Sequence, residues 1–253
     1  MKVKHIYSLT VLICVLSATG CSTESTTSDV VKTEGIWADI RLTSDGDRSR
    51  VVTEFNVNRS TGANIVLSDN DKVQATVGNE TKVLEMDEDF FDIDYQGYFS
   101  QTSQGIEFKL ELMRDKENET LTSVVNLPSK VTLYAPVTST FKLQEQILIE
   151  WKAASEPNTI LELDFSSTCT SNTNDPFSFG YNVKLDDSKG QYNLELSDVA
   201  WFEDETIDKS KPCKSYVTLS RKRNGTIDSR FKSGSTIYAI QRTQSEKFSV
   251  TLN

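Results

Sequence analysis

Histidine is almost absent from this chain, because its 253 residues contain a single one, His5. It lies in a segment that begins with Lys2 and Lys4 and continues as an apolar run from Ile6 to Leu16. This run is too short to cross a bilayer, which needs about 20 apolar residues, and it is typical of a cleaved export signal. Cleavage would leave no histidine, which excludes a Ser-His-Asp triad, a histidine base and a histidine-ligated zinc site.

Positive charge is also scarce. Lysine and arginine number 27 against 37 acidic residues, which gives a formal net charge of −10. Losing Lys2 and Lys4 with the first 20 residues takes this charge to −12. Nucleic acids are held by clustered Lys and Arg, so the charge balance argues against a nucleic-acid partner. The aromatic content of 9% nevertheless allows a folded core.

The residues after the apolar run are Ser17-Ala18-Thr19-Gly20-Cys21. A small residue directly before a cysteine at this point resembles the lipobox of bacterial lipoproteins, although Ala18 stands where Leu is usual. The resemblance implies that residues 1–20 are a lipoprotein signal peptide and that Cys21 carries lipid. Ser22 after the cysteine implies the outer membrane of a Gram-negative cell, with the membrane as a partner through the lipid. An ordinary secretory signal is the alternative.

Two cysteines remain once Cys14 leaves with the signal and Cys21 is lipidated. Cys169 and Cys213 stand 44 positions apart in an exported chain, where disulfides persist, and we expect them to pair. Two free buried thiols are the alternative.

Strand-like alternation of apolar and polar residues dominates the rest of the sequence. The polar residues 21–33 are expected to form a flexible tether, and order is expected from Glu34. After residue 33, short runs in which every second residue is apolar recur at intervals of roughly ten residues, separated by polar turns. One such run has Ile106, Phe108, Leu110 and Leu112 as its apolar residues. This pattern predicts an all-β chain with two tandem β-sandwich domains, at 34–135 and 136–253. One larger sandwich or barrel is the alternative.

The run Ile147-Leu148-Ile149-Glu150-Trp151, with Phe141 before it, resembles the B strand of fibronectin type III-like domains. In those domains an alternating strand ends in a tryptophan that packs between two sheets. The resemblance implies an immunoglobulin/fibronectin III-like topology and no particular activity.

The most distinctive polar run is acidic. It includes Asp87, Asp89, Asp92 and Asp94, which could supply some of the six to eight oxygen ligands that calcium needs. A solvated acidic loop is the simpler interpretation. Aromatic residues lie beside this run, and a sugar could stack on them or they could belong to the core; these candidates are Phe90, Phe91, Tyr95 and Tyr98. A second aromatic group lies at Phe177, Phe179, Tyr181, Trp201 and Phe202.

These features favour a membrane-anchored envelope lipoprotein without enzymatic activity or a cofactor. We expect it to bind a protein or a glycan through the loops or strand edges of its sandwiches. A structural or assembly accessory of the outer membrane is the alternative. A glycoside hydrolase that uses two carboxyl groups is a third hypothesis.

Overall fold

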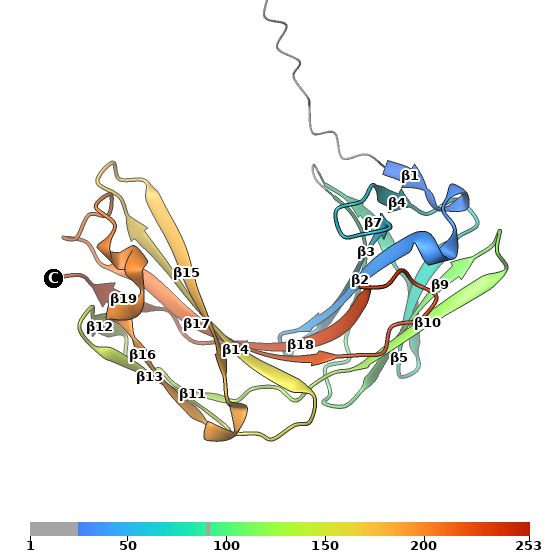
Figure 1. Cartoon of the computed structure of the whole chain (residues 1–253). Coiled ribbons are helices and arrows are strands. Elements are labelled where there is room, and N and C mark those ends of the chain that lie inside the picture. Colours follow the sequence, from blue (N-terminus) through green and yellow to red (C-terminus); the bar gives the residue numbers. More distant parts are fainter. Residues whose placement is uncertain (1–24, 90–91) are drawn as a thin grey trace, which may run out of the picture.

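The computed structural model describes residues 25–89 and 92–253, and these residues form mainly β-structure (Figure 1). The first strands are β1 (Ser25–Thr27), β2 (Ile36–Ser44), β3 (Ser49–Val57), β4 (Asn64–Val66), β5 (Lys72–Val77), β6 (Glu80–Val83), β7 (Glu85–Glu88), β8 (Ile93–Phe99), β9 (Glu107–Arg114) and β10 (Glu119–Asn126). The later strands are β11 (Leu133–Ala135), β12 (Thr140–Lys142), β13 (Gln146–Trp151), β14 (Thr159–Thr170), β15 (Pro176–Leu185), β16 (Gln191–Glu195), β17 (Cys213–Asn224), β18 (Thr236–Gln244) and β19 (Phe248–Thr251). The predicted all-β class is confirmed.

Short 3₁₀ turns are the helical elements of the described residues. They are η1 (Ser28–Val30), η2 (Thr33–Gly35), η3 (Asp187–Lys189), η4 (Leu196–Asp198) and η5 (Ala200–Glu203). Within 25–89 and 92–253, none of these helices has the length and apolar character of a membrane span.

One large sheet runs through the whole molecule in the order β1-β4-β3-β2-β18-β17-β14-β15. Two smaller sheets, β10-β9-β5-β6 and β11-β13-β16, complete the sandwiches. Figure 1 shows the large sheet bent into a V, with one small sheet beneath each arm. The molecule therefore consists of two β-sandwich lobes that share one sheet. Among the described residues, no second sheet covers the inner side of the V.

Each lobe has its own hydrophobic core between the large sheet and one small sheet. The expected alternation sets the buried face, as β2 shows by burying every second residue from Ile36 to Ser44. The N-terminal core includes Ile40, Leu42, Phe55, Phe99, Leu110, Leu112 and Leu121. The C-terminal core includes Ile147, Ile149, Trp151, Leu163, Phe165, Phe202, Val217 and Leu219. Trp151 is buried, as the resemblance to a fibronectin III-like strand implies.

Strand β18 connects the two lobes. It pairs with β17 of the C-terminal lobe in antiparallel register and with β2 of the N-terminal lobe in parallel register. Phe231, Ile237 and Ala239 pack in the N-terminal core, although the expected domain boundary assigns them to residues 136–253. The proposed division at residue 135 stays a prediction, and this returning segment is an exception to it.

A buried arginine ties the lobes together at their junction. Arg221 of β17 is 1% exposed, and its Nε and Nη2 donate to the two carboxylate oxygens of Asp187 at 2.6 and 2.8 Å. Its Nη1 donates to the carbonyl oxygen of Ser129, in the connection between the lobes, at 2.9 Å. Ser129 in turn donates to Glu156, which also pairs with Arg223. These bonds tie the connection between the lobes to β17 and to the loops that carry Glu156 and Asp187.

The segment expected to be a tether is part of the fold from Ser25 onward. β1 pairs with β4, and Ser28 is fully buried, where its hydroxyl donates to Asp71 at 2.6 Å. The buried Arg114 donates to the carbonyl oxygens of Ser28 and Val31 at 2.7 and 2.9 Å. A polar segment can be ordered in this way because a buried guanidinium needs several acceptors and the backbone provides them. The remaining residues of the expected tether, 21–24, lie outside the described residues.

Candidate functional site

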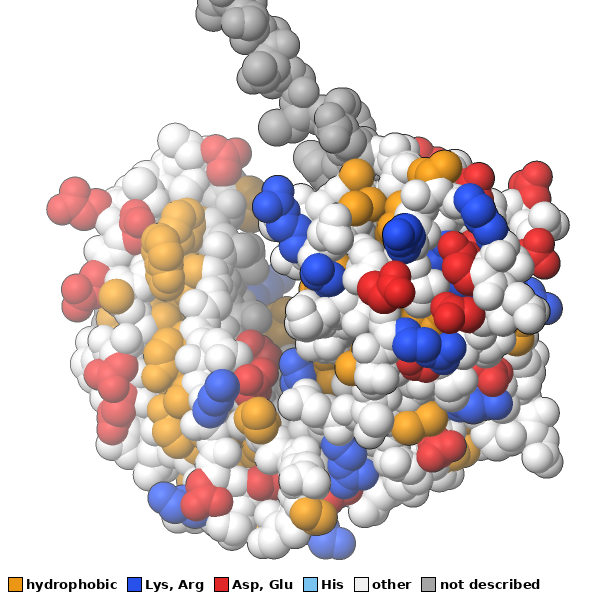
Figure 2. Space-filling model, turned by 45° about the vertical axis from the view of Figure 1, so that its right-hand side comes forward, with side chains coloured by type: hydrophobic (Ala, Val, Ile, Leu, Met, Phe, Trp, Pro, Cys, Tyr) orange, Lys and Arg blue, Asp and Glu red, His pale blue; other side chains and the backbone are white. Residues whose placement is uncertain are grey.

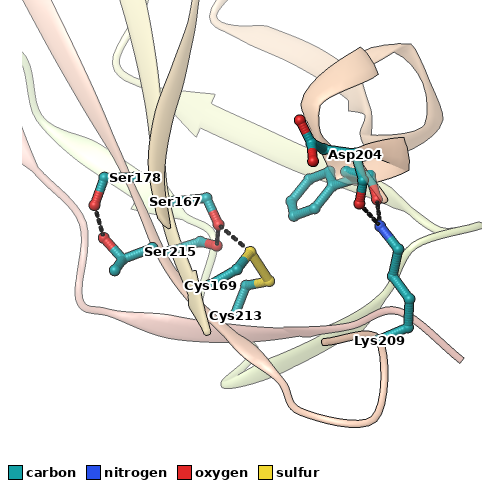
Figure 3. Close-up of a disulfide and its surroundings, with 9 residues drawn as sticks. Ser167, Cys169, Ser178, Asp204, Lys209, Cys213 and Ser215 are labelled. Carbon is teal, nitrogen blue, oxygen red and sulfur yellow. Dashed lines mark hydrogen bonds between the residues drawn. A yellow bond between two sulfur atoms is a disulfide. The ribbon is translucent and has the colours of Figure 1, made fainter. Parts of the chain in front are cut away.

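The predicted disulfide between Cys169 and Cys213 is confirmed (Figure 3). The cysteines lie at the ends of β14 and β17, which are antiparallel neighbours, and their sulfur atoms are 1.95 Å apart. Both are buried in the C-terminal core beside the hydroxyls of Ser167 and Ser215, which are 2.9 Å apart. The bond is therefore part of the scaffold. The candidate lipidation site Cys21 lies outside the described residues.

The acidic run divides into two parts with different surroundings. Asp92 and Asp94 converge with Glu54 of β3, and one oxygen of each lies within 4.8 Å of the others. Asp87 instead accepts a hydrogen bond from Gln96 at 2.7 Å, and Asp89 accepts one from the backbone N–H of Asp92 at 3.0 Å. The four predicted calcium ligands therefore do not form one cluster: Asp87 lies opposite Asp94 across β7 and β8, but neither Asp87 nor Asp89 belongs to the group that Glu54, Asp92 and Asp94 form. Glu54 was missed because it comes from another strand.

Neighbouring polar groups already contact this acidic trio. Asn56 donates to Glu54, and Asn64 donates to Asp92 at 2.8 Å. The Arg41 guanidinium lies 3.8 Å from an oxygen of Asp94. Burial raises the pKa of Glu54, and the charges of Asp92 and Asp94 add to the rise against the opposing bond from Asn56. Burial and the charge of Asp92 likewise raise the pKa of Asp94. The trio is thus a set of repelling carboxylates held by amides and an arginine.

Replacing Glu54 with glutamine should stabilise the protein at pH 7 by up to about 1 kcal/mol. Because the pKa of Glu54 is raised in the folded protein, its contribution to stability is fully present below the pKa of an ordinary carboxyl group. This contribution is lost as the pH rises through the folded-state pKa, so the ionised carboxylate is least favourable at pH 7. Glutamine retains an acceptor for Asn56 without a charge beside Asp92. Thermal melting should therefore show a gain in Tm at pH 7 that shrinks at pH 4.

Glu150→Gln, at an exposed position on β13, is the matched control and should leave the Tm unchanged. A lower Tm for Glu54→Gln at pH 7 would contradict the repulsion argument. Calcium chloride added after chelator treatment should not shift the Tm of the wild type. A calcium-induced rise that Glu54→Gln abolishes would show instead that the trio holds the cation.

The four aromatic candidates also separate. Tyr95 is 4% exposed and packs against Phe55, while its hydroxyl accepts a hydrogen bond from the Leu67 N–H at 2.7 Å. Its prediction as a binding residue is wrong, because the inward face of β8 places it in the core. Tyr98 is 42% exposed and lies on the opposite face of β8. Phe90 and Phe91 lie outside the described residues.

The second aromatic group lies mostly in the packing of the C-terminal lobe. Phe202 is buried and makes an edge-on contact with Phe179, with the ring centres 5.0 Å apart. Phe177 contacts Trp201, whose ring is 52% exposed. Only the tryptophan presents a large aromatic surface to solvent.

Tyr98 borders a pocket of about 560 Å³ on the inner side of the V. Strands β2, β3, β8 and β18 supply its floor, because their outward residues face the same side of the sheet. The lining residues are Arg41, Thr43, Asp45, Arg48, Arg50, Val52, Asp94, Tyr98, Tyr238, Ile240 and Arg242. We call this the arginine pocket. The sequence pattern did not predict it, because Tyr238 and Arg242 reach it only through the pairing of β18 with β2.

The arginine pocket is basic in an otherwise acidic chain. Arg41 is ion-paired with Asp39 at 3.4 Å, whereas Arg48, Arg50 and Arg242 have no carboxylate within 4.0 Å among the described residues. Arg48 instead lies over the Tyr98 ring, with its guanidinium carbon 4.7 Å from the ring centre. Three guanidinium groups are therefore available to an anion.

The β2–β3 hairpin loop holds Arg48 in place. One carboxylate oxygen of Asp45 accepts the backbone N–H groups of Asp47 and Arg48 at 2.9 and 3.2 Å. These two bonds lower the pKa of Asp45 below its ordinary value. Arg50 is fixed as well, because its Nε donates to Gln96 at 2.8 Å. Arg50 and the backbone of Arg48 are thus positioned by contacts within the protein, while Arg242 is exposed.

A second pocket of about 680 Å³ adjoins the first and shares Asp45 and Arg242 with it. It extends onto the C-terminal lobe, and its remaining lining residues are Lys130, Asp164, Ser166, Tyr216, Thr218, Ser220, Thr243 and Gln244. Hydroxyl groups are prominent here, so we call it the hydroxyl pocket. Figure 2 shows the hollow between the lobes, with basic side chains along the edge of the N-terminal lobe. The two pockets together form a groove across the junction.

No family model matches the chain, and no curated protein matches it. Similar solved structures include the chicken CNTN1 FN1–FN3 domains, at 12% identity over 83% of this chain, with a TM-score of 0.21. The chain spans 63% of the length of that fragment. The titin Ig tandem domains A164–A165 match at 8% identity over 87% of this chain and 97% of theirs, with a TM-score of 0.24. These similarities concern the fold alone.

Proposed function

We propose that this chain is a non-enzymatic binding module of the bacterial cell envelope, anchored to the outer membrane through lipid on Cys21. The groove between the lobes receives its ligand, which is an envelope protein or a glycan. The observation that carries this proposal is the set of guanidinium groups without ion pairs that Arg48, Arg50 and Arg242 place on one concave sheet face. Unpaired like charges that are held together repel each other, and a ligand of opposite charge relieves this.

The chemistry of the groove suits binding rather than proton transfer. Arginine stays protonated at all ordinary pH values, and tyrosine ionises far above neutrality, so neither group exchanges a proton readily at pH 7. Of the two carboxylates that line the arginine pocket, Asp94 lies 3.8 Å from Arg41, and Asp45 accepts two backbone N–H groups of its own loop. Rigid strands beneath these side chains keep the entropic cost of binding low.

Charge reversal in the groove tests the binding role. Ligands of the wild type are identified on a glycan array and by crosslinking to purified envelope proteins. The double variant Arg50→Glu/Arg242→Glu should bind these ligands at least tenfold more weakly. Arg59→Glu, an exposed arginine outside the groove, is the matched control and should behave as wild type. Unchanged binding by the double variant to every ligand would exclude the groove as the binding site.

The lipid anchor has its own test. Cys21→Ala should move the protein from the membrane fraction to the soluble periplasmic or culture fraction, because the acyl chains that bind the bilayer are lost. Fractionation followed by immunoblotting measures the distribution. Retention of the variant in the membrane fraction would contradict the anchor without affecting the groove.

A structural or assembly role is favoured by one further feature. β15 is the terminal strand of the large sheet, with no second partner among the described strands. The half-buried rings of Phe177 and Phe179 lie near its start, beside the exposed Trp201. Such an edge can accept a strand from another protein. If this role holds, Trp201→Ala should reduce crosslinking to an envelope protein, and Arg50→Glu/Arg242→Glu should not.

A further inference from the structure

We infer that the groove recognises an acidic oligosaccharide, with its carboxylate or sulfate groups in the arginine pocket and its hydroxyl groups in the hydroxyl pocket. This inference rests on the proposed binding function and specifies the ligand class. It follows from three features of the groove, which are its free guanidinium groups, its hydroxyl-rich extension and the saturated backbone of its floor.

The guanidinium groups suit compact oxyanions. Arg48, Arg50 and Arg242 each present planar N–H donors that match the two oxygens of a carboxylate or sulfate. Arg50 uses its Nε on Gln96, so its terminal nitrogens remain for a ligand. Arg48 rests on Tyr98, which limits its motion while leaving its edge open. Several oxyanions spaced along one ligand would therefore be held better than one.

The hydroxyl pocket suits the rest of a sugar chain. Ser166, Tyr216 and Thr218 are half-buried, and their hydroxyls can both donate and accept hydrogen bonds. Asp45 and Asp164 add acceptors for sugar hydroxyls. A ligand that carried only negative charges would be repelled by these carboxylates, whereas one that alternates acid groups with hydroxyls satisfies both kinds of lining.

An acidic peptide fits this groove less well. The floor consists of β8, β3, β2, β18, β17 and β14, and each of these strands is paired on both sides. Their backbone N–H and C=O groups are already used in the sheet, so an extended peptide cannot add to it as a strand. Nucleic acids need Lys and Arg clustered along the whole contact face, whereas the second half of this groove carries Asp45 and Asp164. Recognition by side chains alone favours the carbohydrate.

Because the two pockets share Asp45 and Arg242, one ligand can occupy both. A sugar chain long enough to cross the junction should therefore bind more tightly than its monomer. The arginine pocket alone sets the affinity for a single acidic sugar, and the hydroxyl pocket contributes only to longer ligands. This separation allows the two halves of the groove to be tested independently.

Isothermal titration of the purified chain tests the inference with four compounds. These are a galacturonic acid tetramer, a sulfated glucose tetramer, a neutral glucose tetramer and monomeric galacturonate. At least one acidic tetramer should bind tenfold or more tightly than the neutral tetramer and the monomer, and added salt should weaken it. The two acidic tetramers distinguish carboxylate from sulfate recognition. The inference would be overturned if neither acidic tetramer bound more tightly than the neutral tetramer.

Variants in each pocket locate the binding. Arg50→Gln/Arg242→Gln should lower the affinity for the acidic tetramer at least tenfold, while Arg59→Gln should leave this affinity unchanged. Ser166→Ala/Thr218→Val should lower the affinity for the tetramer several-fold and leave the affinity for the monomer unchanged. Circular dichroism and thermal melting confirm that each variant is folded. Unchanged affinity in both groove variants would overturn the inference, as would shortening of the tetramer by the wild type, which would indicate a hydrolase.

The failure of this inference is distinguishable from the failure of the proposed function. If a protein or a neutral glycan binds and Arg50→Glu/Arg242→Glu abolishes this binding, the groove is a binding site and the acidic ligand class is wrong. If no ligand of any class responds to the charge reversal, both are wrong.

Discussion

Replacing Arg221 with alanine should lower the free energy of unfolding by about 3–5 kcal/mol. The guanidinium is 1% exposed and holds both oxygens of Asp187 and the carbonyl oxygen of Ser129. Its removal leaves the largely buried Asp187 carboxylate without its cation, although the Trp151 indole N–H still donates to it at 3.0 Å, and leaves the Ser129 carbonyl oxygen without this donor. Both costs fall on the folded state. Because these acceptors belong to the C-terminal lobe and to the connection between the lobes, the loss should loosen the junction as a whole.

Urea unfolding followed by tryptophan fluorescence measures this effect. Trp37 lies in the N-terminal lobe, whereas Trp151 and Trp201 lie in the C-terminal lobe. Fluorescence in a Trp37→Phe background therefore reports on the C-terminal lobe, and its difference from the parent protein reports on the N-terminal lobe. With Arg221 present, both lobes should unfold in one transition, and Arg221→Ala should lower the midpoint or split it into two. Arg59→Ala, at an exposed position, should cost less than about 0.5 kcal/mol. A loss below about 1 kcal/mol for Arg221→Ala would contradict the structural role of the arginine.

Replacing both Cys169 and Cys213 with alanine should lower the free energy of unfolding by about 4 kcal/mol. The bond closes a loop of 44 positions, and its removal increases the conformational freedom of the unfolded chain. Both residues are also buried in the C-terminal core, where alanine leaves only a small gap. The effect should therefore come mainly from the lost crosslink.

A reductant provides the matched control for the disulfide. Dithiothreitol should lower the urea midpoint of the wild type to near that of the double variant and leave the double variant unchanged. Equal midpoints for the wild type with and without the reductant, under conditions that reduce the bond in the unfolded chain, would contradict the prediction.

Much of the scaffold follows from local patterns in the sequence. Alternation along residues 36–44 and 147–151 places Ile40 and Ile149 in their cores, because side chains of a strand point alternately to opposite faces. The disulfide follows from the number of cysteines together with the expectation that the chain is exported. These predictions need only neighbouring residues or a count, and the structure confirms them.

Features that depend on long-range pairing were not predictable in the same way. The pattern of β18 identifies a strand but not its partner, so its pairing with β2, about 200 positions earlier along the chain, has no local signal. Arg114 and Arg221 are buried although arginine is usually exposed, because each collects several acceptors from distant segments. The ordered segment around Ser28 depends on the first of these arginines.

The candidate site shows the same division. Asp92 and Asp94 come together because they are neighbours in sequence, but Glu54 joins them only through the pairing of β3 with β8. Tyr95 and Tyr98 are the same residue type and lie close together in the sequence. They fall on opposite faces of β8, and of the two only Tyr98 lines the groove. The arginine pocket is lined by residues from four strands and a loop, so no single sequence motif predicts it.

The central claim is that the guanidinium groups of the groove bind the ligand. The most direct measurement is an NMR titration of the arginine Nε–H signals with the acidic tetramer that binds in calorimetry. The signals of Arg48, Arg50 and Arg242 should shift with one common affinity, while those of the buried Arg114 and Arg221 should stay in place. Shifts confined to arginines outside the groove, or none at saturating ligand, would contradict the account.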